Sequence, residues 1–503
     1  MVTSLQRPKP TDVLIIGAGP AGLTAAYELA NAGVHSTVFE KDGVVGGLSR
    51  TVNYKDYLFD IGGHRFFTKV ELIERLWREV LGDDLLLRPR LSRIYFESKF
   101  FKYPLEPLDV IEQFGTWELL LCSASYLKAQ LFRTRSEDDM ATWIRHRFGD
   151  RLYRKFFKTY TEKVWGMPCD QIKADWVAQR IRGLTLGAAI QDAFWPQRPP
   201  NKARNRTLTR QFHYPRKGPG MMWTRIRDLV EAKGSEVHLN APVERVFWES
   251  GGVRELQVGG RERPGSHFIS TLPIPTLIRS LDPAPPSAVQ RCADDFSYRD
   301  FLIVALILRG ADLFPDNWVY IHDPQVRVGR IQNYSNWSPE MTPDPSTSSL
   351  GMEYFCSEGD AFWTMSDTEL IAFAGRELDR IGLAGKPQIL DATVIRVPKA
   401  YPVYNATYRR GLAVVQEFLT TVPNLQLVGR NGQHRYNNQD HSMLAGLLAA
   451  RNILGARFNL WDLNTDQDFH EEGLSLTDDE LLGMQASQPL VPELARSDVS
   501  TGA

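Results

Sequence analysis

Three glycines near the N-terminus have the spacing of a phosphate-binding turn. Gly17, Gly19 and Gly22 follow an apolar run, Val13–Ile16, and precede a stretch of helix formers that ends at Gly33. In this context the first glycine permits a tight turn, the second lets the backbone approach a pyrophosphate, and the third lets the helix pack closely on the strand. The N-terminus of the helix then offers free N–H groups and a partial positive charge to phosphates.

A carboxylate completes this nucleotide-binding pattern. Glu40 ends the next apolar run, Ser36–Phe39. It stands about twenty residues after the glycines, where an acid can accept hydrogen bonds from the ribose hydroxyls of a dinucleotide. The alternative is a tight strand–helix turn without a ligand. Because strand, helix and acid all agree, the sequence favours the dinucleotide.

Two further glycine segments indicate which dinucleotide is bound. Gly46-Gly47 and Gly62-Gly63-His64 contain backbone without side chains, over which an extended, flat cofactor can pass. The first pair, placed after the ribose acid, resembles the pattern of FAD proteins related to amine oxidases and glutathione reductase. The sequence therefore predicts FAD as the cofactor and disfavours NAD as the resident one.

The composition is that of a globular enzyme with more than one domain. The chain has 503 residues, of which 43% are hydrophobic and 24% charged, and its net charge is −1. This balance does not point to nucleic acid as a partner. The four cysteines lie far apart and fit neither a disulfide framework nor a zinc site, so no metal site is predicted. Without a signal peptide or a long apolar span, the expected protein is cytoplasmic and has no integral membrane segment.

The order of the predicted elements gives a discontinuous α/β fold. A Rossmann-type FAD-binding domain, similar to that of glutathione reductase, is expected to receive two insertions. Residues 76–211 are predicted to form a helical substrate or cap domain, and residues 281–420 a mixed domain with an antiparallel sheet. Residues 464–503 are acidic and contain Ser and Pro, and are predicted to be a poorly ordered tail. The FAD-binding domain is assigned to residues 10–75, 212–280 and 421–463.

Apolar spacing also predicts individual elements inside the insertions. Helices are expected over Pro107–Phe132 and Arg151–Tyr160. Strands are expected over Phe301–Leu308, Trp318–Ile321 and Leu350–Cys356.

Several segments resemble the UDP-galactopyranose mutases, a branch of the FAD-dependent amine oxidase and protoporphyrinogen oxidase superfamily. Gly62-Gly63-His64 is similar to a flavin-facing segment of these mutases, and Tyr160-Thr-Glu-Lys-Val-Trp165-Gly resembles an active-site segment. Arg180 stands at the position of a phosphate-binding arginine. Arg327, followed by Asn333-Tyr334-Ser335, resembles a second arginine with its companion tyrosine. Further similar segments contain Tyr401, Gly429-Arg430, and the run Arg435-Tyr436-Asn-Asn438-Gln-Asp440-His-Ser442.

The resemblance assigns roles to these residues. The predicted catalytic residues are Arg180, Arg327 and His64. The predicted substrate-binding residues are Tyr160, Trp165, Arg180, Arg327, Tyr334, Tyr401, Tyr436 and Asn438. The predicted FAD-binding residues are Gly17, Gly19, Gly22, Glu40, Gly46, Gly47, Gly62, Gly63, Val243, Gly429, Arg430, Asp440 and Ser442. Each assignment competes with a structural role: a surface ion pair for an arginine, and core packing for a tyrosine or a histidine.

The resemblance implies isomerisation of a UDP-hexose between its pyranose and furanose rings. The N5 atom of reduced FAD would act as the nucleophile, NAD(P)H would be the reductant, and arginines would hold the diphosphate of the nucleotide sugar. The alternative is an FAD-dependent oxidoreductase of the amine oxidase or desaturase type, whose glycine segments would be the same. Such enzymes usually need an apolar tunnel or an aromatic cage, whereas the matched segments here carry arginines.

Overall fold

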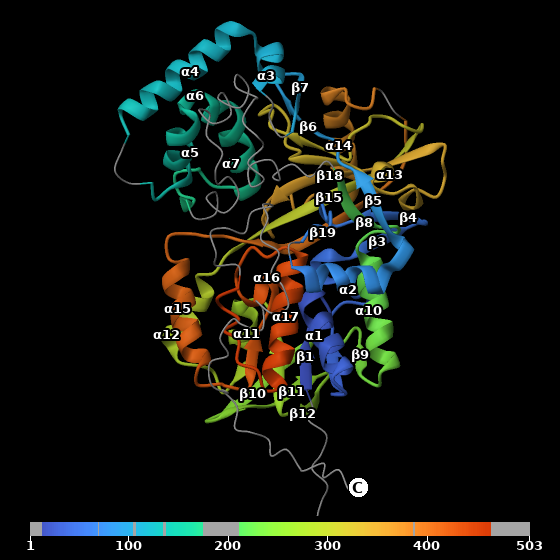
Figure 1. The fold of residues 1–503 in the computed structure, drawn as a ribbon, viewed down its shortest axis with the longest axis vertical. Coiled ribbons are helices and arrows are strands. Elements are labelled where there is room, and N and C mark those ends of the chain that lie inside the picture. The colour runs from blue at the N-terminus through green and yellow to red at the C-terminus, as the bar shows by residue number, and fades with distance from the viewer. Residues whose placement is uncertain are drawn as a thin grey trace, which may run out of the picture.

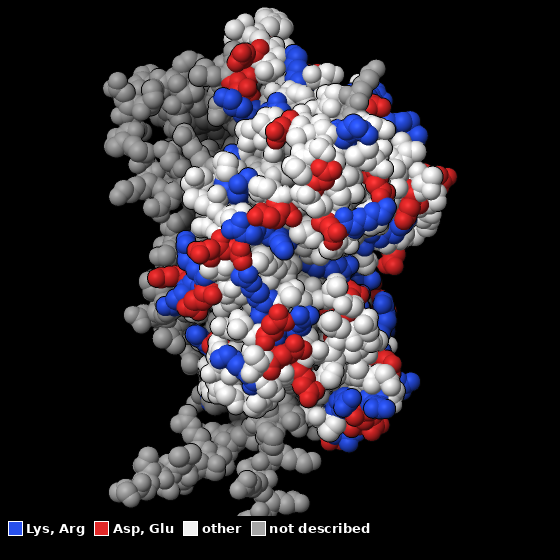
Figure 2. All heavy atoms as spheres, turned by 90° about the vertical axis from the view of Figure 1, so that its right-hand side faces the viewer, with Lys and Arg blue, Asp and Glu red and all other residues white. Residues whose placement is uncertain are grey.

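The computed structural model describes residues 13–68, 70–103, 107–133, 137–174, 211–385 and 388–463. A nucleotide-binding layer lies at one end of the long axis, and a large sheet with a group of helices lies at the other (Figure 1). On the face drawn in Figure 2, Lys and Arg side chains are interspersed with Asp and Glu, so this face carries no large region of one sign.

A parallel sheet confirms the Rossmann-type domain. Its strand order is β20-β13-β1-β2-β9, and every neighbouring pair is parallel. Helices α1, α2, α10 and α17 belong to the same layer (Figure 1). The strands are β1 (Val13–Ile16), β2 (Ser36–Phe39), β9 (Glu236–His238), β13 (His267–Ser270) and β20 (Leu425–Leu427). The helices are α1 (Pro20–Asn31), α2 (Glu71–Leu81), α10 (Gly220–Ala232) and α17 (Gln439–Ile453).

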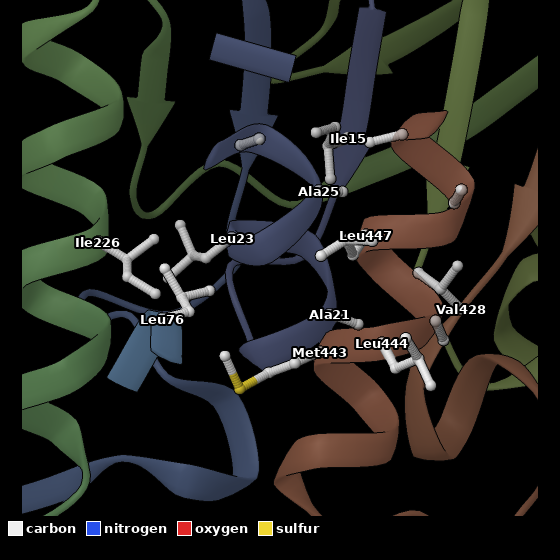
Figure 3. Packing of buried hydrophobic residues seen from close by; sticks show 14 of the residues in the cluster. Ile15, Ala21, Leu23, Ala25, Leu76, Ile226, Val428, Met443, Leu444 and Leu447 are labelled. Carbon is white, nitrogen blue, oxygen red and sulfur yellow. The ribbon is translucent and has the colours of Figure 1, made fainter. Parts of the chain in front are cut away.

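The core of this layer surrounds α1. Leu23 of α1 points toward Leu76 of α2 and Ile226 of α10, while α17 covers another side of α1 (Figure 3). There the helices approach so closely that a Cβ on Gly446 would lie 2.0 Å from the carbonyl oxygen of Ala21. Small residues at this crossing therefore fix α17 against the helix that begins at the glycine turn.

A second, smaller sheet is formed by strands from the middle of the chain. Its order is β12-β11-β10-β14, and only the β10–β14 pair is parallel. Helices α11, α12 and α15 pack beside it. The strands are β10 (Val243–Glu249), β11 (Gly252–Val258), β12 (Arg261–Pro264) and β14 (Leu281–Asp282). The helices are α11 (Ile274–Ser280), α12 (Ser287–Asp294) and α15 (Tyr408–Leu419).

A seven-stranded sheet carries the other half of the molecule, in the order β19-β15-β18-β17-β16-β6-β7. Helix α14 (Asp367–Ile381) covers one face, and the other face packs toward β4 and β8. The sheet extends into the segment predicted to be helical, because the alternating residues of β6 and β7 form a hairpin through Glu97 and Ser98, both at positive φ. The strands are β6 (Ser92–Phe96), β7 (Lys99–Lys102), β15 (Tyr298–Arg309), β16 (Trp318–Ile321), β17 (Arg330–Asn333), β18 (Thr347–Cys356) and β19 (Ile389–Pro402).

The helical group differs from the prediction at two places. The helix expected over Pro107–Phe132 is divided at Gly115, whose φ of 84° ends α3 and begins α4. The helix expected over Arg151–Tyr160 is π-helical at its centre, Tyr153–Lys158. The helices are α3 (Pro107–Phe114), α4 (Thr116–Leu131), α5 (Met140–Phe148), α6 (Asp150–Leu152) and α7 (Thr159–Trp165).

Short elements connect the two halves of the molecule. They are β3 (Thr51–Tyr54), β4 (Tyr57–Asp60), β5 (Leu85–Pro89), β8 (Gln211–Pro215), α13 (Tyr334–Trp337) and α16 (Gly429–Gly432). In the part of the chain that the structure describes, no helix is long and apolar enough to cross a membrane.

The glycine turn provides a matched pair of variants. A Cβ on Gly22 would lie 1.9 Å from the carbonyl oxygen of Gly17, whereas a Cβ on Gly19 would meet only the Cα of Gly47, at 3.8 Å. We expect Gly22→Ala to lower the free energy of unfolding by about 3 kcal/mol, because backbone must move. Gly19→Ala should change it by less than about 1 kcal/mol. Urea unfolding of the cofactor-free protein measures both, and equal losses would contradict this account of the turn.

Candidate functional site

The glycine turn between β1 and α1 has the geometry that a bound phosphate requires. Gly17 has a φ of +100°, and a Cβ there would lie 2.0 Å from Oγ1 of Thr271. Gly22 lets α1 pack on the turn, while a Cβ on Gly19 would meet only the Cα of Gly47, at 3.8 Å. Backbone without side chains therefore lies beside the first N–H groups of α1, which are the groups that can bind a pyrophosphate.

Glu40 ties this turn to the end of β2. Its carboxylate is buried and accepts hydrogen bonds from the N–H groups of Ala18 (2.8 Å) and Asp42 (3.0 Å). A carboxylate has about four acceptor positions, so capacity remains for ribose hydroxyls. The start of β10 lies nearby, because Ala241, two residues before Val243, donates its N–H to the carbonyl of Glu40.

The second glycine pair contacts the first glycine turn. Gly46 (φ +104°) donates its N–H to the carbonyl of Ala18, at 2.8 Å. Gly47 (φ +52°) lies so close to the turn that its Cβ would come within 3.2 Å of Cα of Gly19. Together these segments form a continuous surface of bare backbone.

The C-terminal segment adds the N-terminus of α17. Asn438 is exposed at the start of this helix and donates its N–H to Nδ1 of His441 at 3.1 Å, while the N–H of His441 donates to Oδ1 of Asp440 at 2.9 Å. Asp440 and Ser442 are buried in its first turn. Gly429 (φ +81°) allows α16 to approach Ala21 of α1, because a Cβ there would lie 3.2 Å from the Cβ of Ala21.

His64 lies at the other end of the predicted cofactor site. A Cβ on Gly62 would meet the ring of His64 at 2.8 Å, and a Cβ on Gly63 would meet the guanidinium of Arg330 at 2.8 Å. Nδ1 of His64 is buried and has no hydrogen-bond partner among the described residues. Bare backbone, an imidazole and an arginine thus meet at one place.

Arg330 was not among the predicted site residues. It forms a two-pronged ion pair with Glu353, with Nε and Nη2 each 2.9 Å from a carboxylate oxygen, and Gln332 also donates to this carboxylate. Glu353 is fully buried. The alternation of polar and apolar residues in the strand could have indicated this residue. In Arg330-Ile-Gln332 the two polar residues lie on the same face of the strand.

Arg327 takes a different position from the one predicted. Its guanidinium lies 4.1 Å from the ring centroid of Phe362, which belongs to the apolar cluster beneath α14. Its N–H donates to Glu377 of α14, and the residue is exposed. Arg327 is therefore on the α14 side of the sheet, whereas Arg330 faces His64. Arg180 lies outside the described residues.

A group of aromatic rings surrounds the cation of Arg430. The rings of Tyr401 and Tyr436 are parallel, with centroids 5.7 Å apart, and Trp165 packs at 6.4 Å against Tyr401. The guanidinium of Arg430 lies over both tyrosine rings, at 5.4 Å and 4.8 Å. Its Nε and Nη1 donate to the carbonyls of Asn437 and Ala400, both at 2.9 Å.

Tyr160 lies in a second aromatic group. Its ring stacks on His322, with centroids 4.5 Å apart, and meets the edge of Tyr320 at 5.6 Å. Lys163, one turn later on α7, donates to three carbonyls of the β16–β17 connection, from Ile321, Asp323 and Val328. This lysine therefore holds the strand that presents His322 and Tyr320 against α7.

Tyr334 does not face this group. It is fully buried, packs against Gly351, and donates its hydroxyl to the carbonyl of Asp60 at 2.8 Å. The position predicted to bind substrate is thus filled by core packing, which supports the end of β4 just before Gly62.

The electrostatic environment keeps His64 neutral. Burial, followed by the positive charges of Arg430 and Arg330, lowers the pKa of His64 from 6.5 to about 3. Burial also raises the pKa of Tyr401 to about 12, with the neighbouring Tyr436 adding to the effect. At neutral pH the site therefore offers a neutral imidazole, phenolic hydroxyls and fixed guanidinium groups.

Comparison with known proteins agrees with these features. The family described as flavin containing amine oxidoreductase matches residues 20–454. An L-amino-acid oxidase of Crotalus adamanteus is 47% identical over 118 residues, which cover 20% of this chain and 22% of that protein. Protoporphyrinogen oxidase 2 of Arabidopsis thaliana is 46% identical over 52 residues, 10% of each chain. The chain thus matches only about a fifth or less of the length of these relatives.

Solved structures match over nearly the whole fold. Reduced UDP-galactopyranose mutase superimposes with a TM-score of 0.76 at 20% identity, covering 88% of this chain and 94% of that one. A putative protoporphyrinogen oxidase from Exiguobacterium sp. 255-15 gives 0.69 at 17% identity, covering 88% and 98%. At these identities the likeness shows the fold alone. With the family match, it confirms the predicted superfamily, and the mutase branch stays a prediction. The chain belongs to the flavin containing amine oxidoreductase family.

Proposed function

We propose that this protein is an FAD-dependent oxidoreductase that acts on an anionic substrate. The observation that carries the proposal is the position of Arg430 over the faces of Tyr401 and Tyr436. A cationic amine would need those aromatic faces, and the protein's own guanidinium takes them. An anion, in contrast, would be attracted to Arg430.

The residues that would hold FAD follow from the bare-backbone surface. The turn at Gly17–Gly22 and the N-terminus of α1 suit the pyrophosphate, and Glu40 suits the ribose. The absence of a side chain at Gly19 and the unpartnered Nδ1 of His64 support this fit. When bound, FAD supplies the electron-transfer chemistry that the family shares.

The side chains around His64 would bind and orient the substrate. Two backbone carbonyls fix the orientation of Arg430, and its remaining N–H groups can bind a carboxylate or phosphate. Glu353 neutralises Arg330, so Arg430 supplies the uncompensated positive charge there. The neutral imidazole of His64 can accept or donate one hydrogen bond without adding charge.

A second candidate is isomerisation of a UDP-hexose, as the resemblance to the mutases implies. The likeness to reduced UDP-galactopyranose mutase favours it, as does Tyr160, which already stacks on His322 and is the kind of ring on which a uracil can stack. This activity would require reduced FAD, with NAD(P)H as the proposed reductant, and would cause no net oxidation of the substrate.

The two candidates differ in what happens to the flavin. For the oxidoreductase, we expect hydroxylated carboxylates or phosphates to bleach the oxidised FAD band under anaerobic conditions, while putrescine does not. Absorbance at the flavin maximum measures this directly. Bleaching by amines alone would contradict the proposal. Conversion of UDP-galactopyranose by the photoreduced protein, without net consumption of NAD(P)H, would establish the second candidate instead.

Arg430 is the side chain to test for substrate charge. Arg430→Gln should weaken binding of an anionic substrate about tenfold to hundredfold, because a hydrogen bond to a charged group contributes about 1.5–3 kcal/mol. Arg430→Lys should restore only part of the affinity, since lysine lacks the planar fork. The exposed Arg78, paired with Glu74, provides the control Arg78→Gln. Unchanged affinity in Arg430→Gln, with FAD still bound, would remove Arg430 from substrate binding.

The low pKa of His64 makes the stability of the folded protein depend on pH. Because the folded-state value is about 3 and the ordinary value 6.5, the unfolded chain binds more protons between these values. The contribution of neutral His64 to stability is therefore complete above 6.5 and falls as pH drops toward 3. We expect His64→Gln to flatten the fall in unfolding free energy between about pH 6 and pH 4. Unfolding free energies can be measured by chemical unfolding at several pH values in this range. If they fall equally steeply with pH in the wild-type protein and in His64→Gln, the low pKa of His64 is contradicted.

A further inference from the structure

Arg90 lies directly after β5 with a guanidinium group that the surrounding protein only partly satisfies. Its Cζ lies 5.5 Å from the ring of Tyr103 and 5.9 Å from the ring of Trp318. Nη2 reaches the carbonyl of Tyr103 only at 3.5 Å, the limit for a hydrogen bond. Nε is buried and has no hydrogen-bond partner among the described residues.

The charges around Arg90 do not compensate it. Of the described groups that act on its ionisation, one is the cation of Arg65 and the others are the phenols of Tyr103 and Tyr320; no carboxylate is among them. Burial, and then Arg65, lowers the pKa of Arg90. Arg93, three residues later, shows the usual arrangement, with Nε 2.9 Å and 3.0 Å from the two carboxylate oxygens of Asp316.

The position of Arg90 relates it to the candidate active site. Tyr103 meets Tyr320 at 5.0 Å, and Tyr320 meets Tyr160 at 5.6 Å. Tyr320 is also the direct strand partner of Arg330 in the β16–β17 pair. Paired residues on neighbouring strands share one face of a sheet, so Tyr320 and Arg330 lie on the same face. Arg90 is on the other side of Tyr320, beyond Tyr103, and Tyr320 therefore lies between the two arginines.

We propose that Arg90 forms a second oxyanion subsite of the candidate substrate site, separated by Tyr320 from the position beside Arg330 and Arg430. The planar fork of arginine binds a phosphate or a carboxylate equally well in geometry. An anion there would use the buried Nε and relieve the repulsion between Arg90 and Arg65. The inference rests on the proposed function and deepens it: the substrate carries two anionic groups, one at each end of the tyrosine-lined wall.

Anion binding to the FAD-loaded protein tests this subsite. The probes are inorganic phosphate, inorganic pyrophosphate and malonate, each titrated at constant ionic strength, with the unfolding temperature as readout. We expect Arg90→Gln to weaken binding of the preferred probe about tenfold or more, and Arg90→Lys to recover part of it. Preference for the phosphates or for malonate distinguishes a phosphate group from a carboxylate.

A measurement without anion separates this role from a structural one. If Arg90 binds a ligand, Arg90→Gln should unfold at the same or a higher temperature in the absence of anion, because it no longer repels Arg65. If Arg90 only supports Tyr103 and Trp318, the variant should be less stable and probe binding should be unchanged, which would overturn the subsite. Arg78→Gln, at an exposed position of α2, is the matched control for loss of a positive charge.

Comparison with Arg430→Gln distinguishes failure of the second subsite from failure of the proposed anionic substrate. Weaker binding in Arg430→Gln, with wild-type binding in Arg90→Gln, would reject the second subsite and leave the anionic substrate in place. A wild-type protein that binds none of the probes would contradict both.

Discussion

The buried ion pair between Arg330 and Glu353 is the constraint on which the site depends. Glu353 is fully buried in β18, and an isolated carboxylate there would be very costly. Arg330 compensates it through two parallel hydrogen bonds, and Gln332 binds the same carboxylate. The glycine at position 63 leaves room for the guanidinium, since a Cβ there would lie 2.8 Å from Nη1. The pair therefore fixes the large sheet against the segment that precedes His64.

A second set of hydrogen bonds supports the same segment from the other side. The hydroxyl of Tyr334 donates to the carbonyl of Asp60, and Tyr214 and Thr51 both donate to its carboxylate. Burial raises the pKa of Asp60 to about 7, opposed by the bonds from Tyr214 and Thr51. Gly62 and Gly63 thus follow a strand end that is held by hydrogen bonds from β3, β8 and α13, close to Arg330.

Local patterns in the sequence predict the fold of the β1–α1–β2 unit well. The turn at Gly17, the strand Ser36–Phe39 and the acid Glu40 lie within one strand–helix–strand unit, so short-range spacing is sufficient to place them. The substrate side depends on which face of a sheet each residue occupies. Arg327 and Arg330 are three residues apart, yet only the register of β17 on β18 shows that Arg330 meets Glu353. The fully buried position of Tyr334 against Gly351 likewise follows from packing between distant segments, which local spacing does not show.

This division also explains how one family can keep its cofactor site and change its substrate. The surface that suits FAD is backbone made bare by glycines, and any side chain added at Gly22 or Gly63 would collide with neighbouring atoms. The residues facing it come from α7, β16, β17 and the end of β19, and from the segment after α16. None of them helps to form the glycine turn, so their charges can change without disturbing it. In this chain Arg330 of β17 lies among these residues, and Arg90, after β5, and Arg430, in α16, add positive charge from neighbouring elements. Fold and family therefore point to the flavin cofactor, whereas the choice of substrate depends on side chains and charges that the fold does not fix.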